Sequence, residues 1–158
     1  MQRIKPFLWF NDKAEEAIDF YVSVFPGAKR GSTSRVPEGG PGKPGSVMIA
    51  SFILDGVEIV VLNGGPHQSF TDAISLMVPC DSQAEIDDLW EKMTVDGGQE
   101  VACGWLRDKF GVPWQITPAN MGQLLAGKGA EGAQRAMAAM MQMKKLDIAA
   151  LERAGGLA

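Results

Sequence analysis

The chain has 158 residues, a formal charge of −4 and scattered basic residues, so it can bury a core but offers nucleic acid no basic footprint. No apolar run reaches the roughly 18 residues of a membrane span, and no signal-peptide pattern precedes Ile4, so we expect a cytoplasmic protein with no membrane and no nucleic-acid partner. Two cysteines and one histidine form neither a disulfide framework nor a zinc-ligand spacing.

The first predicted elements are a strand and a helix. The aromatic run Ile4–Phe10 is typical of a strand, and Asp12 with Glu15 has the spacing of a capping box. Pro26-Gly27 ends the apolar repeat that follows. The repeat consists of Ala14, Ala17, Ile18, Tyr21, Val22 and Phe25. Its intervals of three and four residues predict an amphipathic helix that covers one face of a sheet.

Three strands are predicted next. They span residues 28–36, 46–54 and 57–62. Asp55-Gly56 between the last two is a strong hairpin signal. The glycine-rich stretch at 39–42 lies between predicted antiparallel strands, whereas the turn that binds S-adenosylmethionine joins a strand to a helix in a parallel unit. We therefore interpret it as a loop.

The pattern then starts again. Ile74–Pro79 predicts a strand, and Ser82 with Glu85 predicts a capped helix that ends at Gly97. Its buried stripe consists of Ile86, Leu89, Trp90 and Met93. Sliding the chain by 69 positions superimposes the two halves and lays Pro6 on Ser75. The second half therefore repeats the first.

Three more strands complete the repeat. They span residues 99–104, 105–109 and 112–118. Gly111 can supply the positive φ that the turn of the last hairpin requires. Residues 113, 115 and 117 alternate with Val112, Trp114 and Ile116, so the last strand has an apolar face and a face with a lone amide, Gln115.

We therefore predict an α+β fold of two βαβββ modules that form a half-open sheet around a cavity. The first module spans 1–65, the linker and second module 66–118 and a helical tail 119–158, within one structural domain overall. A small sheet with one open apolar face would expose that face to water, so pairing of the modules should enclose a ligand cavity.

The tail is rich in Ala, Met, Lys and Gln. We expect the stretch Gly127–Gly132 to interrupt it, and Asp147 to cap a final helix. Five residues fall at helical spacing, Ala133, Met137, Met140, Met141 and Lys144, and the methionines favour packing on the body or in a homodimer. An alternative is an interaction protein whose tail binds a partner helix.

The doubled βαβββ order, Phe20-Tyr21 and Asp108-Lys109-Phe110-Gly111 resemble the vicinal oxygen chelate superfamily of glyoxalase I, bleomycin resistance proteins and extradiol dioxygenases. Within it, the segments at 6–10, 64–67, 104–115 and 143–152 resemble the PhnB-like subgroup, often labelled 3-demethylubiquinone-9 3-methyltransferase. The resemblance covers nearly the whole chain, but one fold hosts many reactions.

That superfamily holds a divalent metal with His and Glu side chains on the first and last strand of each module. Carried over by position, the slots fall at Pro6, Asn63 or a neighbour, Ser75 and Gln115. None is His, Asp or Glu, and amides and a hydroxyl bind zinc, iron or nickel weakly. We therefore predict no metal and no other cofactor.

The resemblance and the strand parity give the expected ligand-binding residues. They are Leu8, Phe10, Asn63, Ser75, Met77, Trp105 and Gln115. Parity should turn Leu8, Phe10, Met77 and Gln115 toward the cavity, and Trp9 and Trp114 toward the helices.

Side chains that could move a proton are few. Cys103 and His67 are the weak catalytic candidates, although a packed thiol and a solvated loop histidine are the simpler interpretations. Cys80 precedes a helix N-terminus, where the dipole can lower a thiol pKa, but it too is more simply a packed thiol.

Two functional hypotheses remain open besides the interaction protein. The first is a metal-free protein that binds or sequesters a small hydrophobic or aromatic molecule. The alternative is an isomerase, lyase or transferase that acts on such a molecule in the same cavity. Replacement of Cys103 or Gln115 should abolish catalysis but largely spare binding.

Overall fold

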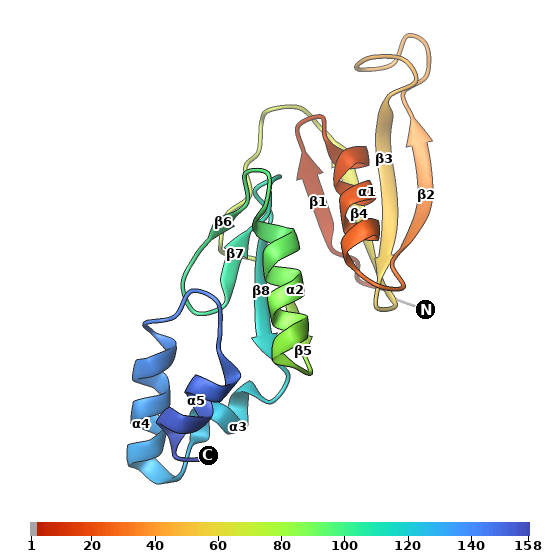
Figure 1. Ribbon diagram of the computed structural model, residues 1–158. Coiled ribbons are helices and arrows are strands. Elements are labelled where there is room, and N and C mark those ends of the chain that lie inside the picture. The colour runs from red at the N-terminus through yellow and green to blue at the C-terminus, as the bar shows by residue number, and fades with distance from the viewer. Residues whose placement is uncertain (1–2) are drawn as a thin grey trace. The chain divides into compact units, whose positions relative to one another are not determined.

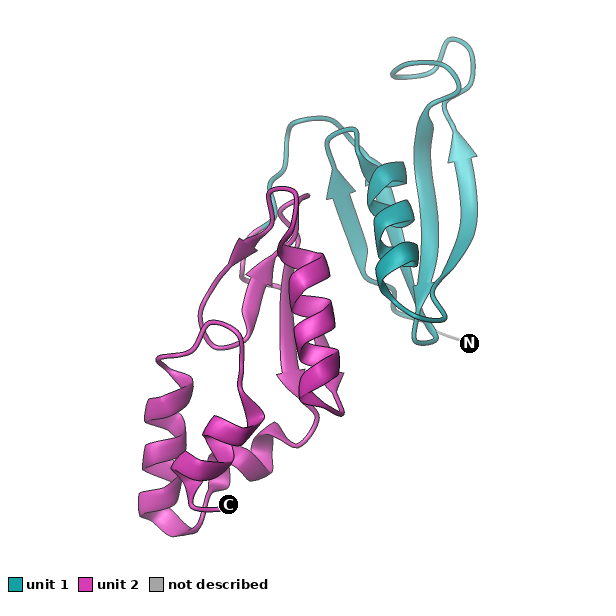
Figure 2. Ribbon diagram, in the orientation of Figure 1, with its two compact units in different colours: residues 1–70 teal, residues 71–158 magenta. Residues whose placement is uncertain are grey.

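The computed structural model describes residues 3–158. The chain divides into two compact units, residues 1–70 and residues 71–158 (Figure 2). The segment 66–70 thus belongs to the first unit, and the helical tail belongs to the second. Among the described residues, no helix has the length and apolar character needed to cross a membrane.

Unit 1 has the order β1-α1-β2-β3-β4, as the sequence predicts (Figure 1). Its elements are β1 (Phe7–Phe10), α1 (Ala14–Val24), β2 (Lys29–Arg35), β3 (Val47–Leu54) and β4 (Val57–Asn63). The strands form one sheet in the order β1-β4-β3-β2, in which β1 runs parallel to β4 and the other pairs are antiparallel. Asp55 and Gly56, both at positive φ, make the predicted hairpin turn between β3 and β4.

The core of unit 1 lies between α1 and one face of this sheet. Tyr21 of α1 stacks on Phe52 of β3 with ring centroids 5.2 Å apart, and both side chains are fully buried. Phe52 pairs with Ile59 of β4, and residues two apart on a strand share a face. The helix therefore covers Phe52, Ile59, Ala50 and Val61, all of them buried.

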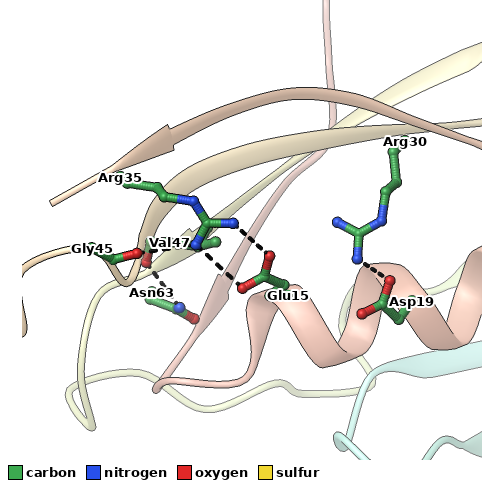
Figure 3. A network of polar contacts seen from close by, with 7 residues as sticks. All are labelled: Glu15, Asp19, Arg30, Arg35, Gly45, Val47 and Asn63. Atoms are coloured by element: carbon green, nitrogen blue, oxygen red, sulfur yellow. Dashed lines mark hydrogen bonds and ion pairs between the residues drawn. The ribbon is translucent and has the colours of Figure 1, made fainter.

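The start of α1 differs from the prediction. The residue that precedes the helix is Lys13, and Asp12 forms no capping box with Glu15. Instead, the Asn63 side chain of β4 accepts a hydrogen bond from the Ala14 backbone N–H at 2.8 Å. Glu15 turns to Arg35 of β2, whose Nη2 lies 2.8 Å from Oε1 (Figure 3). Tertiary partners thus replace the local cap.

Unit 2 repeats the order and adds three helices. Its elements are β5 (Leu76–Cys80), α2 (Gln83–Thr94), β6 (Gln99–Glu100), β7 (Trp105–Arg107), β8 (Pro113–Pro118), α3 (Met121–Ala126), α4 (Gly129–Met140) and α5 (Ile148–Gly155). The sheet order is β5-β8-β7-β6, with β5 parallel to β8. The predicted strand at 99–104 keeps only two residues, because the backbone turns at Cys103 and Gly104, both at positive φ.

The cap of α2 is the one that the sequence predicts. Ser82 Oγ accepts a hydrogen bond from the Glu85 N–H at 3.2 Å. The Glu85 carboxylate reaches back to the N–H of Asp81 at 2.8 Å, one residue earlier than a capping box would place it. Ile86, Leu89, Trp90 and Met93 are all buried.

The tail packs within its own unit. Its break is shorter than predicted, because α4 already begins at Gly129 and Gly132 is buried within it. Asp147 caps α5 as predicted by accepting from the Ala150 N–H at 2.8 Å. Leu146, in the segment between α4 and α5, is fully buried, and Gln83 of α2 donates to its carbonyl at 3.0 Å. The tail is therefore joined to the βαβββ body of unit 2.

Candidate functional site

One side of the unit 2 sheet faces α2 and the other does not. Trp90 of α2 donates to the Glu100 carboxylate at 2.8 Å. Glu100 shares a row with Leu106 of β7, and Leu106 pairs with Trp114 of β8. Trp114 therefore lies on the α2 side, as predicted, and it is 1% exposed. The opposite side is called the unit 2 face below, and its residues are Ser75, Met77, Trp105, Arg107 and Gln115.

Three predicted ligand-binding residues form one row across the unit 2 face. Gln115 pairs with Met77 of β5 on one side and with Trp105 of β7 on the other. Because paired residues on neighbouring strands share a face, Met77 and Trp105 flank the Gln115 amide. Met77 is 60% exposed although it is apolar. The row thus presents an amide between two large apolar side chains.

Ser75, the fourth predicted residue of this unit, is bonded to the same amide. Gln115 Nε2 donates to Ser75 Oγ at 2.9 Å. Ser75 lies just before β5, 40 positions away from Gln115 in the sequence. The structure therefore brings Ser75, Met77, Trp105 and Gln115 together on one face.

An ion pair that the sequence reasoning missed borders this group. Arg107, two residues after Trp105 on β7, donates from Nε to Asp72 Oδ1 at 3.0 Å and from Nη2 to Asp72 Oδ2. Hydrogen bonds from Arg107 hold the pKa of Asp72 below its usual value, and Asp72 raises the pKa of Arg107. The two charges cancel each other at the edge of the face. The spacing of 35 residues gave no local signal for this pair.

Unit 1 corrects the predicted strand parity. Leu8 of β1 pairs with the buried Val61, and Phe10 pairs with Asn63, whose side chain reaches the start of α1. Leu8 and Phe10 therefore lie on the α1 side, not on the open side as predicted. Trp9 takes the open side, where its indole donates to the Gly65 carbonyl at 2.9 Å.

The error comes from one extra residue in the first strand–helix connection. β1 ends at Phe10 and α1 begins at Ala14, whereas β5 ends at Cys80 and α2 begins at Gln83. A shift of 69 positions therefore aligns α1 with α2, but it aligns each residue of β1 with the wrong residue of β5, one position away. A shift of one residue turns every side chain of a strand to the other face.

Part of the open side of the unit 1 sheet, on β1 and the neighbouring strands, is apolar. It carries Phe7, Trp9, Ile49, Val60 and Leu62, here called the unit 1 face. Phe7 is 55% exposed. No amide or hydroxyl of the predicted set lies on this face, so the polar part of the predicted site is on unit 2.

Asn63 has a structural role in unit 1. Its Nδ2 donates to the Val47 carbonyl at 3.0 Å (Figure 3). Its Oδ1 accepts from the Ala14 N–H at 2.8 Å. Both ends of the amide are therefore bonded to backbone groups, one at the start of α1 and one in β3. This arrangement ties the helix to the sheet.

Asp108, part of the motif that carries the family resemblance, organises the last hairpin. It is 2% exposed, and its carboxylate accepts from the N–H groups of Phe110 and Val112 at 2.9 and 3.0 Å. The Trp114 indole donates to its other oxygen at 2.9 Å. Gly111 turns at φ +84°, as predicted. The motif therefore shapes the strand that carries Gln115.

The structure places the catalytic candidates Cys103 and His67 in different units. The Cys103 thiol points to the tail, where it donates to the Met140 carbonyl at 3.6 Å and lies 3.8 Å from Met141 Sδ. His67 is exposed in the segment between β4 and β5, in unit 1. Cys80 is buried, and burial, with Glu85 and Asp81 nearby, raises its pKa to about 12. Cys80 is thus a packed thiol.

The residues at the metal slots of the superfamily do not fit a divalent ion. Ser75 and Gln115 offer a neutral hydroxyl and amide that are bonded to each other, and the Asn63 amide is bonded to the backbone. With the one-residue correction, the first-strand slot moves from Pro6 to Lys5, a cation paired with Glu58. Residues 3–158 contain no group of three or more His, Cys, Asp or Glu side chains close enough to hold a metal.

Comparison with solved structures supports the fold assignment. A protein from Bacillus cereus, described as a putative 3-demethylubiquinone-9 3-methyltransferase, PhnB protein, is 40% identical and has a TM-score of 0.69, with coverage of 75% of this chain and 100% of that chain. Protein PA1353 from Pseudomonas aeruginosa is 21% identical over 75% of this chain and 98% of its own, with a TM-score of 0.58.

A third similar structure is the fosfomycin resistance protein FosX of Listeria monocytogenes, in a mutant form described as complexed with Mn(II) and 1S,2S-dihydroxypropylphosphonic acid. It is 16% identical over 79% of this chain and 99% of its own, with a TM-score of 0.53, and so shows the fold alone. No protein of curated function matches the chain.

The family comparison agrees with the resemblance found in the sequence. Residues 2–117 match the 3-demethylubiquinone-9 3-methyltransferase family, which covers both βαβββ modules apart from the last residue of β8. The chain therefore belongs to this PhnB-like family, within the vicinal oxygen chelate fold.

Proposed function

We propose that the chain is a small-molecule binding protein that holds a flat hydrophobic or aromatic ligand on the unit 2 face without a divalent metal. The observation that carries the proposal is the Met77–Gln115–Trp105 row, with Ser75 bonded to its central amide. Ligand sites commonly combine apolar walls with a few placed polar groups, and this row has that composition.

The donor set supports binding without a metal. A catalytic metal of this fold would need anionic or imidazole ligands to hold it against water, and the slots offer a serine hydroxyl and neutral amides. The Mn(II) in the description of FosX belongs to that protein.

An enzymatic role on this face has less support. General acid–base catalysis needs a titratable group within reach of the substrate. The Cys103 thiol is bonded to the tail, and the carboxylate of Asp72 is held in a two-point ion pair by Arg107. The methyl transfer named in the family description would also need a donor site, and the glycines at 39–42 lie in the loop between β2 and β3.

Titration with two flat probes, 2-naphthamide and 2-naphthoate, tests the proposal. The full chain, freed of metal with a chelator, is expected to bind at least one probe saturably, with one site per chain and with no change when zinc or manganese is added. Isothermal titration calorimetry reports affinity and stoichiometry together.

The variant Trp105→Ala should weaken binding about tenfold, since an aromatic contact contributes about 1–1.5 kcal/mol. Met137→Ala, which truncates an exposed methionine of α4, is the matched control and should leave binding unchanged. The proposal would be wrong if neither probe saturates, if binding requires added metal, or if Trp105→Ala has no effect.

A further inference from the structure

We infer that the ligand of the unit 2 face is an uncharged molecule whose polar group both donates and accepts hydrogen bonds, such as a primary carboxamide, attached to a flat apolar body. This inference rests on the proposed function and specifies the chemistry of its ligand. It predicts that a carboxylate of the same shape binds more weakly.

First, the hydrogen bond between Gln115 and Ser75 leaves other donor and acceptor groups of these two side chains for a ligand. With Gln115 Nε2 donating to Ser75 Oγ, the serine hydrogen is left as a donor and Gln115 Oε1 as an acceptor. If the serine donates to the amide oxygen instead, the amide N–H₂ is left as a donor and the serine lone pairs as acceptors. In either orientation the pair offers a neutral donor beside a neutral acceptor.

A ligand that only accepts leaves part of this pair unsatisfied. A ligand carboxylate can accept a hydrogen bond from Ser75 or from the Gln115 amide, but it has no hydrogen to donate to the remaining acceptor of the pair. A buried acceptor without a donor loses its water without compensation. A carboxamide satisfies both groups, because its oxygen accepts and its nitrogen donates. The pair therefore favours a ligand with both functions.

The second step is the charge of the face. Its cation, Arg107, is held at two points by Asp72, through Nε at 3.0 Å and through Nη2. Asp72 neutralises the charge of Arg107, so an anionic ligand that reaches the remaining N–H groups of Arg107 also meets the negative carboxylate of Asp72 beside them. The pair therefore favours an uncharged ligand over an anion.

The third step is the shape of the row. Neighbouring strands lie about 4.8 Å apart, so Met77 and Trp105 are separated by about 10 Å across the central Gln115. A flat bicyclic ring spans this width and can contact both apolar side chains while its polar substituent meets the amide. The ligand class is therefore a flat apolar body with one neutral polar group.

Paired titrations of 2-naphthamide and 2-naphthoate test the inference, because the two probes share a ring and differ in charge. The wild-type full chain should bind the amide at least about tenfold more tightly. Gln115→Leu has a side chain of similar size and should remove most of this preference, because it weakens binding of naphthamide more than binding of naphthoate. Isothermal titration calorimetry at pH 7 measures both affinities.

Asp72→Asn gives the opposite change, since it frees Arg107 beside the row. We expect about tenfold tighter binding of naphthoate and unchanged binding of naphthamide. Asp88→Asn is the matched control, because it removes the same charge from an ion pair with Lys92 on the exposed side of α2. It should change neither affinity.

The outcomes separate the two proposals. If wild type binds naphthoate as tightly as naphthamide, or if Asp72→Asn gives no gain for naphthoate, the inference is overturned while the proposed function stands. If neither probe binds, the proposed function fails and this inference fails with it.

Discussion

Asp108 shows how one buried residue positions the candidate site. Its carboxylate accepts hydrogen bonds from two backbone N–H groups and from the Trp114 indole. These bonds fix the hairpin that leads into β8. Trp114, which is bonded to Asp108, directly precedes Gln115 in that strand. Asp108, one residue of a motif that carries the family resemblance, therefore shapes the strand of the candidate site.

The variant Asp108→Asn tests this role. Asparagine has the same size, but its N–H₂ group would face an N–H donor that now binds a carboxylate oxygen. The hydrogen bonds that remain would be to a neutral oxygen and therefore weaker. We expect a loss of roughly 2–4 kcal/mol of unfolding free energy in urea titrations. Asp96→Asn, an exposed aspartate, should stay within about 0.5 kcal/mol. Equal stability of the two variants would contradict the role.

A substitution at Asn63 tests whether this residue has a structural role or a ligand-binding role. Asn63→Ala removes the cap on Ala14 and the bond to Val47, so we expect a loss of roughly 1–2 kcal/mol of stability with probe affinity unchanged. Asn11→Ala, at an exposed position before α1, is the control and should be nearly neutral. Loss of probe binding at full stability would instead support the predicted ligand contact.

At the scale of elements, local signals were predictable and distant partners were not. Ser82 caps α2 from within the same segment, so its spacing with Glu85 revealed it. Asn63 caps α1 from 49 positions away, and no local pattern of residues records that contact. For the same reason, the spacing of Asp12 and Glu15 predicted a capping box that the structure does not form, because the cap comes from Asn63.

Strand parity was predictable only where the register of the repeat was right. In unit 2 the alternation at Met77, Gln115 and Trp114 is confirmed by the pairing of β5, β7 and β8. In unit 1 the extra residue between β1 and α1 reversed the predicted positions of Leu8 and Phe10. Hydrophobicity could not reveal this error, because both faces of β1 are apolar.

The attachment of the tail gives a prediction at this scale. Leu146 is fully buried between α4 and α5, and the N–H groups of Cys103 and Gly104 donate to the carbonyls of Met143 and Lys144 at 2.8 and 2.7 Å. Leu146→Ala should lose roughly 2–4 kcal/mol of unfolding free energy. The control Leu157→Ala, at a position 48% exposed, should lose much less. Similar small losses in both would show that the tail is not part of the folded unit.

At the scale of the whole molecule, ion pairs make stability sensitive to acid. The pKa of Glu15 is lowered, chiefly by its hydrogen bond to Arg35, and the pKa of Asp72 is lowered, chiefly by Arg107. The folded state therefore binds these protons less readily than the unfolded state. The contribution of these ion pairs to stability is fully present above the ordinary pKa of a carboxyl group. It is lost as the pH falls through the lowered pKa values of the folded state.

Urea midpoints measured between about pH 6 and pH 2.5 test this dependence. Stability should fall on acidification, and Glu15→Gln should show a smaller fall than wild type because it removes one of the lowered carboxyl groups. Glu38→Gln, in the loop between β2 and β3, should keep the wild-type acid response. An unchanged profile in Glu15→Gln would rule out a contribution from the Arg35 pair.

The central claim is that the face carrying Gln115 and Ser75 works without a divalent metal. The most direct test is the metal content of the full chain, purified without chelator from cells supplied with zinc, nickel, manganese and iron, by inductively coupled plasma mass spectrometry. We expect far less than one equivalent of any of these metals per chain. About one equivalent in wild type, lost in Gln115→Leu, would contradict it.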